Sequence, residues 1–178
     1  SRRQRQMCIR DSTESIYYLT KSFDKQRPVI TNDGWVHTIS DILTLHDYEE
    51  YGERFTARYE NKKDFVTNEH QFNQDFYAFA DGYQYQNQPI IISEFGGIAF
   101  TTEKAEDWGY GNQVRNEEQF MTRFDAIHQA IQELPFITGY CYTQLTDVEQ
   151  EVNGLLTTDR KPKVDLAKVK EINTRRVK

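Results

Sequence analysis

The sequence lacks the features that mark several large classes of protein. Its 178 residues contain only two cysteines, and no run approaches the roughly 18 consecutive apolar residues of a membrane-spanning helix. The N-terminus has no apolar stretch of the kind found in a secretory signal. Positive charge is also scarce, because 22 Lys and Arg oppose 28 Asp and Glu. The net charge of -6 argues against nucleic acid as a partner, since phosphate backbones are bound by basic patches.

Common catalytic signatures are missing as well. The histidines at positions 37, 46, 70 and 128 lack the close spacing of a zinc site, and His128 is expected on a solvated helix face. The sequence has no G-x-S-x-G elbow of a serine hydrolase. No glycine-rich phosphate loop follows any strand pattern. We therefore expect neither a metal nor another cofactor.

The first twelve residues differ from the rest of the chain. They read SRRQRQMCIRDS, with four arginines, one acid and no apolar periodicity, and so predict neither a helix nor a strand. Part of this string resembles a translated sequencing adapter, so we divide the chain into a non-native tail, 1–12, and a domain, 13–178; a natural basic tail is the alternative. Without the tail Cys141 is the only cysteine, which excludes an intrachain disulfide and leaves the compartment open.

Helical and extended patterns alternate after the tail. Strands are expected at 28–31, 41–46, 89–92 and 136–142. Helices are expected around Ile16, Leu19 and Phe23, around Phe72, Phe76 and Phe79, from Asn116 to Leu134 with a capping box to Gln119, and from Asp165 onward. Residues 101–112 read as a long polar loop. This alternation predicts an α/β fold with a parallel sheet that forms half of a (β/α)8 barrel, or alternatively an open doubly wound sheet.

Glu94 is the strongest candidate for chemistry. It follows the apolar run 89–92, and a carboxylate at the end of a buried strand is held rigidly at the mouth of a barrel. Gly96 and Gly97 come next and allow a backbone or a ligand to approach closely. The alternative is an acid that merely caps the following loop.

Other polar and aromatic side chains collect at the remaining strand ends. They are Asn32, Asp33 and Trp35, then His46 and Tyr48, then Gln144, together with Trp108 from the polar loop. Amides, acids, an imidazole and aromatic rings suit a sugar, which offers both hydroxyls and apolar faces. Each also has an ordinary explanation. Residues 32–34 can simply form a turn, and His46 can hydrogen-bond the backbone. Trp35, Tyr48 and Trp108 can be packing residues.

Four segments together resemble one known family. They read PVITNDGW at 28–35, DILTLHDY at 41–48, PIIISEFGG at 89–97 and ITGYCYTQLTDVE at 137–149. They are similar to the C-terminal half of the catalytic barrel of glycoside hydrolase family 2, the family of β-galactosidases, β-glucuronidases and β-mannosidases. The string NGLLTTDRKPK at 153–163 fits the end of that barrel, so the resemblance covers nearly everything after Ser12.

The resemblance implies roles for individual residues. Glu94 takes the place of the family's nucleophile, and Tyr48 that of the tyrosine that hydrogen-bonds the nucleophile and favours its ionised form. The family's acid/base is a glutamate that follows an asparagine at the end of a strand. Asn68-Glu69 and Asn116-Glu117 have this dipeptide, but the first lies in a polar loop pattern and the second at the start of a helix pattern. The acid/base, the first barrel strands and the β-sandwich domains are thus expected upstream, and the isolated chain is expected to be inactive.

The resemblance also bears on substrate. Glucuronidases of the family hold the sugar carboxylate with an Asn-x-Lys signature, whereas residues 149–154 here read EQEVNG, without lysine. We therefore expect a β-glycosidase acting on a neutral sugar, with a galactoside favoured, through a retaining mechanism. A non-catalytic carbohydrate-binding barrel is the alternative.

Overall fold

The computed structural model describes the backbone of residues 2–73, 76–100 and 107–175. The chain forms two compact units. Unit one contains residues 1–46, 61–93 and 136–139, and unit two contains residues 47–60, 94–135 and 140–178. None of the helices among the described residues combines the length and apolar character needed to cross a membrane.

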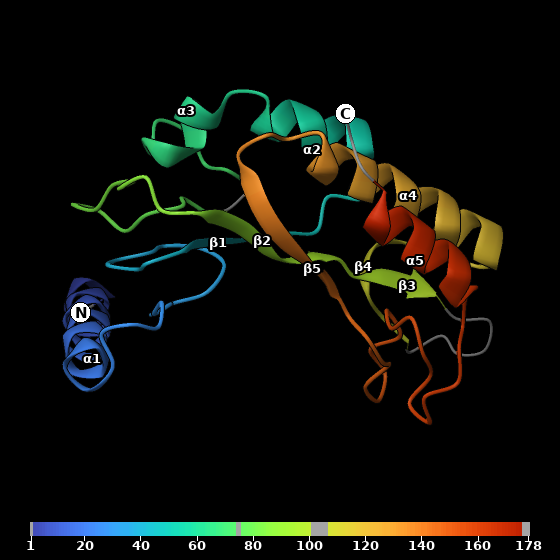
Figure 1. The fold of residues 1–178 in the computed structure, drawn as a ribbon, viewed down its shortest axis with the longest axis horizontal. Coiled ribbons are helices and arrows are strands. Elements are labelled where there is room, and N and C mark those ends of the chain that lie inside the picture. Colours follow the sequence, from blue (N-terminus) through green and yellow to red (C-terminus); the bar gives the residue numbers. More distant parts are fainter. Residues whose placement is uncertain (1, 74–75, 101–106, 176–178) are drawn as a thin grey trace. The chain divides into compact units, whose positions relative to one another are not determined.

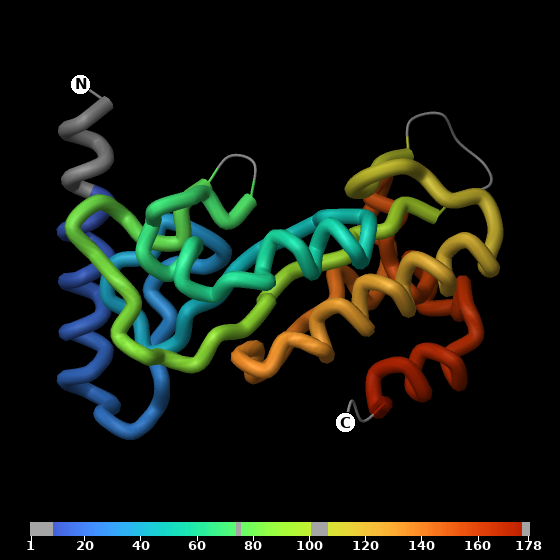
Figure 2. The backbone as a smooth tube through the Cα atoms, turned by 90° about the horizontal axis from the view of Figure 1, so that it is seen from above, coloured from blue at the N-terminus to red at the C-terminus, as the bar shows by residue number. Residues whose placement is uncertain are grey.

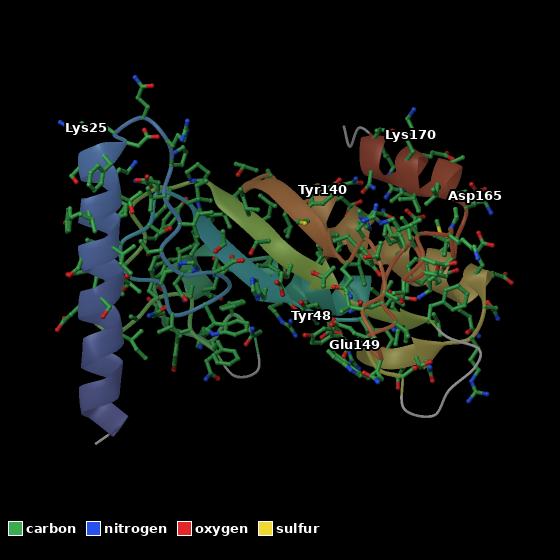
Figure 3. The ribbon with its side chains drawn as sticks, turned by 90° about the horizontal axis from the view of Figure 1, so that it is seen from below. Lys25, Tyr48, Tyr140, Glu149, Asp165 and Lys170 are labelled. Carbon is green, nitrogen blue, oxygen red and sulfur yellow. The ribbon has the colours of Figure 1, made fainter. Side chains whose placement is uncertain are left out.

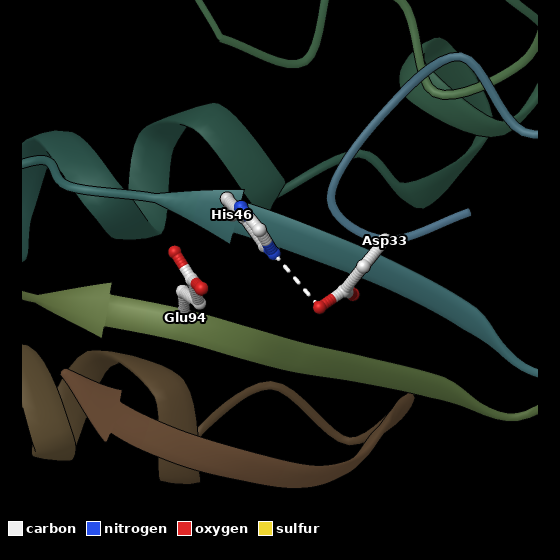
Figure 4. Close-up of side chains that lie close together, drawn as sticks. All are labelled: Asp33, His46 and Glu94. Carbon is white, nitrogen blue, oxygen red and sulfur yellow. Dashed lines mark ion pairs between the residues drawn. The ribbon is translucent and has the colours of Figure 1, made fainter. Parts of the chain in front are cut away.

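Three strands form a sheet in the order β1 (Leu43–Asp47), β2 (Ile90–Gly96) and β5 (Ile137–Thr143). They run in the same direction (Figure 4). The predicted α/β class with parallel strands is therefore confirmed, and the sheet is open rather than closed into a barrel. The apolar residues Leu43, Leu45, Ile90 and Ile92 are buried on one face of their strands, whereas Ile91 on the other face is partly exposed.

The strand expected at 28–31 does not form. The backbone N–H of Val29 donates to the Asp41 carboxylate at 2.8 Å, and its carbonyl accepts from the Asp41 N–H at 2.9 Å. Pro28 has no N–H to give to a neighbouring strand. The segment is consequently held as a loop by one aspartate instead of by a strand ladder.

The N-terminal helix is longer than expected. Helix α1 (Arg2–Phe23, Figure 1) passes through residues 2–12, so the prediction of neither helix nor strand there was wrong. The face that carries Ile16, Leu19 and Phe23 is exposed, at 57%, 58% and 85%. The polar face is attached instead, because the Tyr17 hydroxyl donates to Asp41 at 2.7 Å.

The helix expected around Phe72, Phe76 and Phe79 is also absent from the residues described there. The side chain of Asn73 accepts from the Phe76 N–H at 3.0 Å, and that of Asn68 binds both backbone groups of Phe79. Such side-chain bonds compete with helical hydrogen bonding. Two short helices precede this segment instead, α2 (Gly52–Tyr59) and α3 (Lys62–Val66).

Unit two contains a second, two-stranded sheet that the sequence pattern did not reveal. Strands β3 (Ile98–Phe100) and β4 (Tyr110–Val114) are parallel, with Ile98 opposite Tyr110. The expected polar loop at 101–112 is thus partly strand, and residues 101–106 lie outside the described residues. The strand β4 has no alternation of apolar residues, so its sequence gives no strand signal.

Two of the helices of unit two form as predicted. Helix α4 (Glu117–Gln132) begins at Asn116, whose side chain accepts from the Gln119 N–H at 2.9 Å. Helix α5 (Leu166–Thr174) begins at Asp165 and lies beside α4 (Figures 2 and 3). Their buried faces pack with the two-stranded sheet in one core that includes Ile98, Val114, Phe120, Phe124 and Val169.

His128 contradicts its predicted solvent exposure. It is fully buried on α4, where its Nδ1 lies 2.7 Å from the Phe124 carbonyl oxygen and its ring contacts Phe95. Burial lowers its pKa to about 4. The neutral imidazole is therefore a packed core group at neutral pH.

Candidate active site

Glu94 lies near the end of β2, after the buried residues Ile90 and Ile92. The strand ends where Gly96 and Gly97 adopt positive φ angles of 84° and 54°. A side chain at Gly96 would collide with the Tyr142 ring, since its Cβ would lie 2.3 Å from Tyr142 Cε2. Glycine is therefore required two residues after the candidate nucleophile for both conformational and steric reasons.

Tyr48, which follows β1 and is labelled in Figure 3, donates a hydrogen bond from its hydroxyl to Glu94 Oε2. Burial, and then the hydrogen bond to Glu94, raise the pKa of Tyr48 far above its ordinary value. The phenol therefore stays protonated and acts as a donor. The two residues of unit two that the sequence singled out for chemistry are in direct contact.

The position of Tyr48 depends on the buried Asp47 beside it. Asp47 is 2% exposed and is paired with Arg58 on α2, which also binds Glu49 at 3.0 Å. Burial raises the pKa of Asp47, and Arg58 opposes that rise. This pair attaches the end of β1 to α2, one residue before the tyrosine.

Tyr110 is a site residue that sequence reasoning missed. Its ring stacks on the ring of Tyr48, with centroids 3.5 Å apart and an interplanar angle of 7°. Its N–H donates to the Gly97 carbonyl at 2.8 Å. The WGYG string at 108–111 offers an aromatic residue between glycines as a signal, but its partner is distant in sequence.

Trp108 lies next to this stack and is 48% exposed. Its ring centroid is 6.0 Å from that of Tyr110. Its backbone is held by the loop after β5, because its N–H donates to the Gln150 carbonyl at 2.8 Å and its carbonyl accepts from Val152 at 2.9 Å. The arrangement offers a partly exposed aromatic surface on a fixed backbone.

Gln144 follows β5 in unit two, after a cis peptide bond from Thr143. Its carbonyl accepts from the Leu155 N–H at 3.2 Å. The side-chain Nε2 is buried and has no hydrogen-bond partner among the described residues. An amide donor left open in this way could bind a hydroxyl oxygen.

The remaining predicted residues belong to unit one. Asp33 and His46 form an ion pair of 3.1 Å, drawn in Figure 4. Burial opposes ionisation of Asp33, but hydrogen bonds from Ser93, Thr44 and His46 outweigh it and lower the pKa. Ser93, immediately before Glu94, donates to Asp33 at 2.6 Å.

Asn32 and Trp35 have structural roles in the same turn. The amide of Asn32 donates to the Trp35 carbonyl. The indole stacks on Phe76 with centroids 4.3 Å apart and meets His46 edge-on at 5.1 Å. Their assignment to substrate binding stays a prediction.

Unit two contains a groove of about 1060 Å³ between α2 and α4, lined by residues that include Glu53, Arg54, Glu118 and Gln129. None of the predicted site residues lines this groove.

Comparison with known proteins shows the family of the chain. The family model for glycosyl hydrolases family 2, TIM barrel domain, matches residues 6–177. The chain belongs to glycosyl hydrolase family 2. It therefore represents part of that family's TIM barrel domain, and the predicted fold class is confirmed. The match includes residues 6–12, while the boundary drawn at Ser12 stays a prediction. No curated protein matches the chain.

Solved structures of the family share the fold. A β-glucuronidase from Faecalibacterium prausnitzii matches with a TM-score of 0.57 and 18% identity over 92% of this chain. A β-glucuronidase from Ruminococcus gnavus, in complex with an N1-substituted uronic isofagomine, matches with a TM-score of 0.58, 17% identity and the same coverage. The chain spans 27% and 28% of those two proteins. At this identity the likeness concerns the fold.

Proposed function

We propose that the complete protein containing this chain is a retaining β-glycosidase in which Glu94 is the nucleophile. The observation that carries the proposal is the hydrogen bond from the Tyr48 hydroxyl to Glu94 Oε2 at the ends of two adjacent parallel strands. A nucleophilic carboxylate must be ionised and aimed at the anomeric carbon. A phenol that stays protonated stabilises the anion and restricts its rotation.

The chemistry follows from one carboxylate here and a second from elsewhere in the barrel. Glu94 attacks the anomeric carbon and forms a glycosyl ester, while the second carboxyl, about 5–5.5 Å away in retaining enzymes, protonates the leaving oxygen. The same second group then removes a proton from water, which hydrolyses the ester. Neither step uses a cofactor.

We further propose a neutral sugar, with a β-galactoside as the first substrate to test. A uronate needs a free cation, and the loop 149–154 contributes Glu149 and Glu151 but no lysine. Lys163 is close to this loop but occupied, because its Nζ bonds both Asp147 oxygens, at 2.7 and 2.9 Å, and the Val152 carbonyl at 2.9 Å. All three ammonium donors are therefore used.

Covalent trapping in the complete protein tests the nucleophile. A 2-fluoro glycoside should label Glu94, as found by peptide mapping, and Glu94→Gln should abolish both label and turnover while keeping the shape of the site. A label on another residue would refute the assignment. Retained sugar binding without any label or turnover would instead support a non-catalytic carbohydrate-binding barrel.

Substrate preference is tested separately with matched nitrophenyl glycosides. We expect the galactoside to be hydrolysed and the glucuronide to be poor, because the carboxylate would meet no free lysine in the loop after β5. A preference for the glucuronide would contradict the neutral-sugar proposal and leave the role of Glu94 intact.

A further inference from the structure

The loop that carries Tyr48 is docked onto β4 at two points within unit two. At the first, the Tyr48 ring lies face to face with Tyr110, with centroids 3.5 Å apart. At the second, Glu50 accepts hydrogen bonds from the backbone N–H and the side-chain amide of Asn112, both at 2.8 Å. Residues 48 and 50 are thus matched to residues 110 and 112.

Strand β4 is in turn attached to the segment that follows Glu94. The Tyr110 N–H donates to the Gly97 carbonyl at 2.8 Å. Gly97 also leaves the space that both rings occupy, since a Cβ there would lie 2.4 Å from Tyr110 Cδ2 and 2.9 Å from Tyr48 Cδ1. The nucleophile strand and the stacked pair are therefore joined three residues beyond Glu94.

These contacts determine how the Tyr48 hydroxyl can move. A tyrosine ring on a loop can rotate about its side-chain bonds, and a small rotation displaces the hydroxyl at its tip the most. A ring stacked face to face blocks that rotation on one side by direct steric contact. The hydrogen bond to Glu94 then forms from an orientation that is already selected.

We propose that Tyr110 is a positioning residue that holds Tyr48 in the orientation in which its hydroxyl reaches Glu94. This inference rests on the proposed role of Glu94 as nucleophile. Tyr110 acts through Tyr48, by stacking, and its own hydroxyl is not needed. Glu50 supports the same loop from the second docking point, where Arg123 also approaches it at 3.3 Å.

Kinetics of the complete protein test the proposal. Tyr110→Leu removes the aromatic face and should lower kcat about tenfold, with KM changed less than about twofold. Tyr110→Phe keeps the face and should restore most of that loss. Tyr51→Leu is the matched control: it is the same substitution in the same loop, at a 45% exposed residue whose ring contacts Arg54.

A double-mutant cycle separates positioning from general structural support. If Tyr110 acts through the Tyr48 hydroxyl, Tyr110→Leu should cause almost no further loss in a Tyr48→Phe background. Losses that multiply would overturn the proposal. A rise in KM with unchanged kcat would overturn it too, because it would place Tyr110 in sugar binding.

A second variant covers the case in which Tyr110→Leu does not fold, as checked by thermal unfolding. Glu50→Ala removes the hydrogen bonds to Asn112 and leaves the aromatic stack in place; it should lower kcat about threefold and should also lose its effect in a Tyr48→Phe background. An unchanged kcat would overturn the proposal. Fluoroglycoside labelling of the wild type gives the independent control. If Glu94 is labelled but Tyr110→Leu leaves kcat unchanged, only the inference about Tyr110 is refuted. If another residue is labelled, the proposed role of Glu94 is refuted as well.

Discussion

Replacing Tyr48 by phenylalanine should remove the hydrogen bond to Glu94 together with the contact between the hydroxyl and Thr143. The Phe ring keeps the shape that stacks on Tyr110, so the hydroxyl that donates to Glu94 is the main loss. Hydrogen bonds to charged groups contribute roughly 1.5–3 kcal/mol. If that interaction aligns Glu94 for attack, kcat should fall about ten- to a hundredfold.

The assay is initial-rate kinetics of the complete protein on an aryl β-galactoside. We expect KM to change by less than about twofold, because the hydroxyl contacts the carboxylate and is already occupied before the sugar binds. Tyr51→Phe, in the same loop and 45% exposed, is the matched control and should behave as wild type.

The pH dependence gives a second criterion for the same variant. Burial and the hydrogen bond to Glu94 raise the pKa of Tyr48, so its titration should not produce the alkaline limb of the wild-type profile. That limb should persist in Tyr48→Phe. A raised KM with full kcat, or loss of the alkaline limb, would refute the assigned role.

Three further predictions concern stability and the close packing of the site. Burial lowers the pKa of His128 in the folded protein to about 4, below the unfolded value near 6.5, so stability should be lost as the pH falls from 6.5 to 4. Urea unfolding at several pH values should show a loss on the order of 3 kcal/mol. The loss should be smaller in His128→Gln. Arg58→Ala should destabilise the domain by about 3–5 kcal/mol, because it leaves Asp47 buried without its partner, and a thermal midpoint equal to wild type would contradict this. Gly97→Ala should reduce kcat more than Gly82→Ala does. Both glycines have positive φ, but a Cβ at Gly97 would collide with the Tyr48 and Tyr110 rings, whereas a Cβ at Gly82 meets open space. Equal effects on kcat would show that backbone strain alone is responsible.

Local patterns were sufficient for the three strands of the main sheet, although the strand expected at 28–31 does not form. The run of isoleucines before Glu94 predicts a buried strand, and the glycines after it predict where the strand ends. The start of α4 was equally clear, because Asn116 and Gln119 form their cap within one turn. In each case the signal and its structural effect lie within a few residues of each other.

The roles of Glu94 and Tyr48 came from resemblance to a family, and their contact could be anticipated because adjacent parallel strands end at one edge of a sheet. The orientation of α1 could not be anticipated in the same way. Its apolar residues share one face, yet the bond between Tyr17 and Asp41 attaches the opposite face. An amphipathic pattern indicates which face is apolar, not which neighbours the fold provides.

Only the tertiary structure placed Tyr110 on Tyr48 and His128 in the core. Tyr110 lies on a polar strand that exists because it pairs with β3 and docks on the loop after β1, sixty-two residues away in sequence. His128 is polar by composition, and its burial depends on Phe95 and Phe124 closing around a ring whose Nδ1 faces a backbone carbonyl. The sequence by itself determines elements whose signals are local. Contacts between distant segments depend on which surfaces the folded chain brings together, because the local sequence around a residue does not specify which distant residue it will contact.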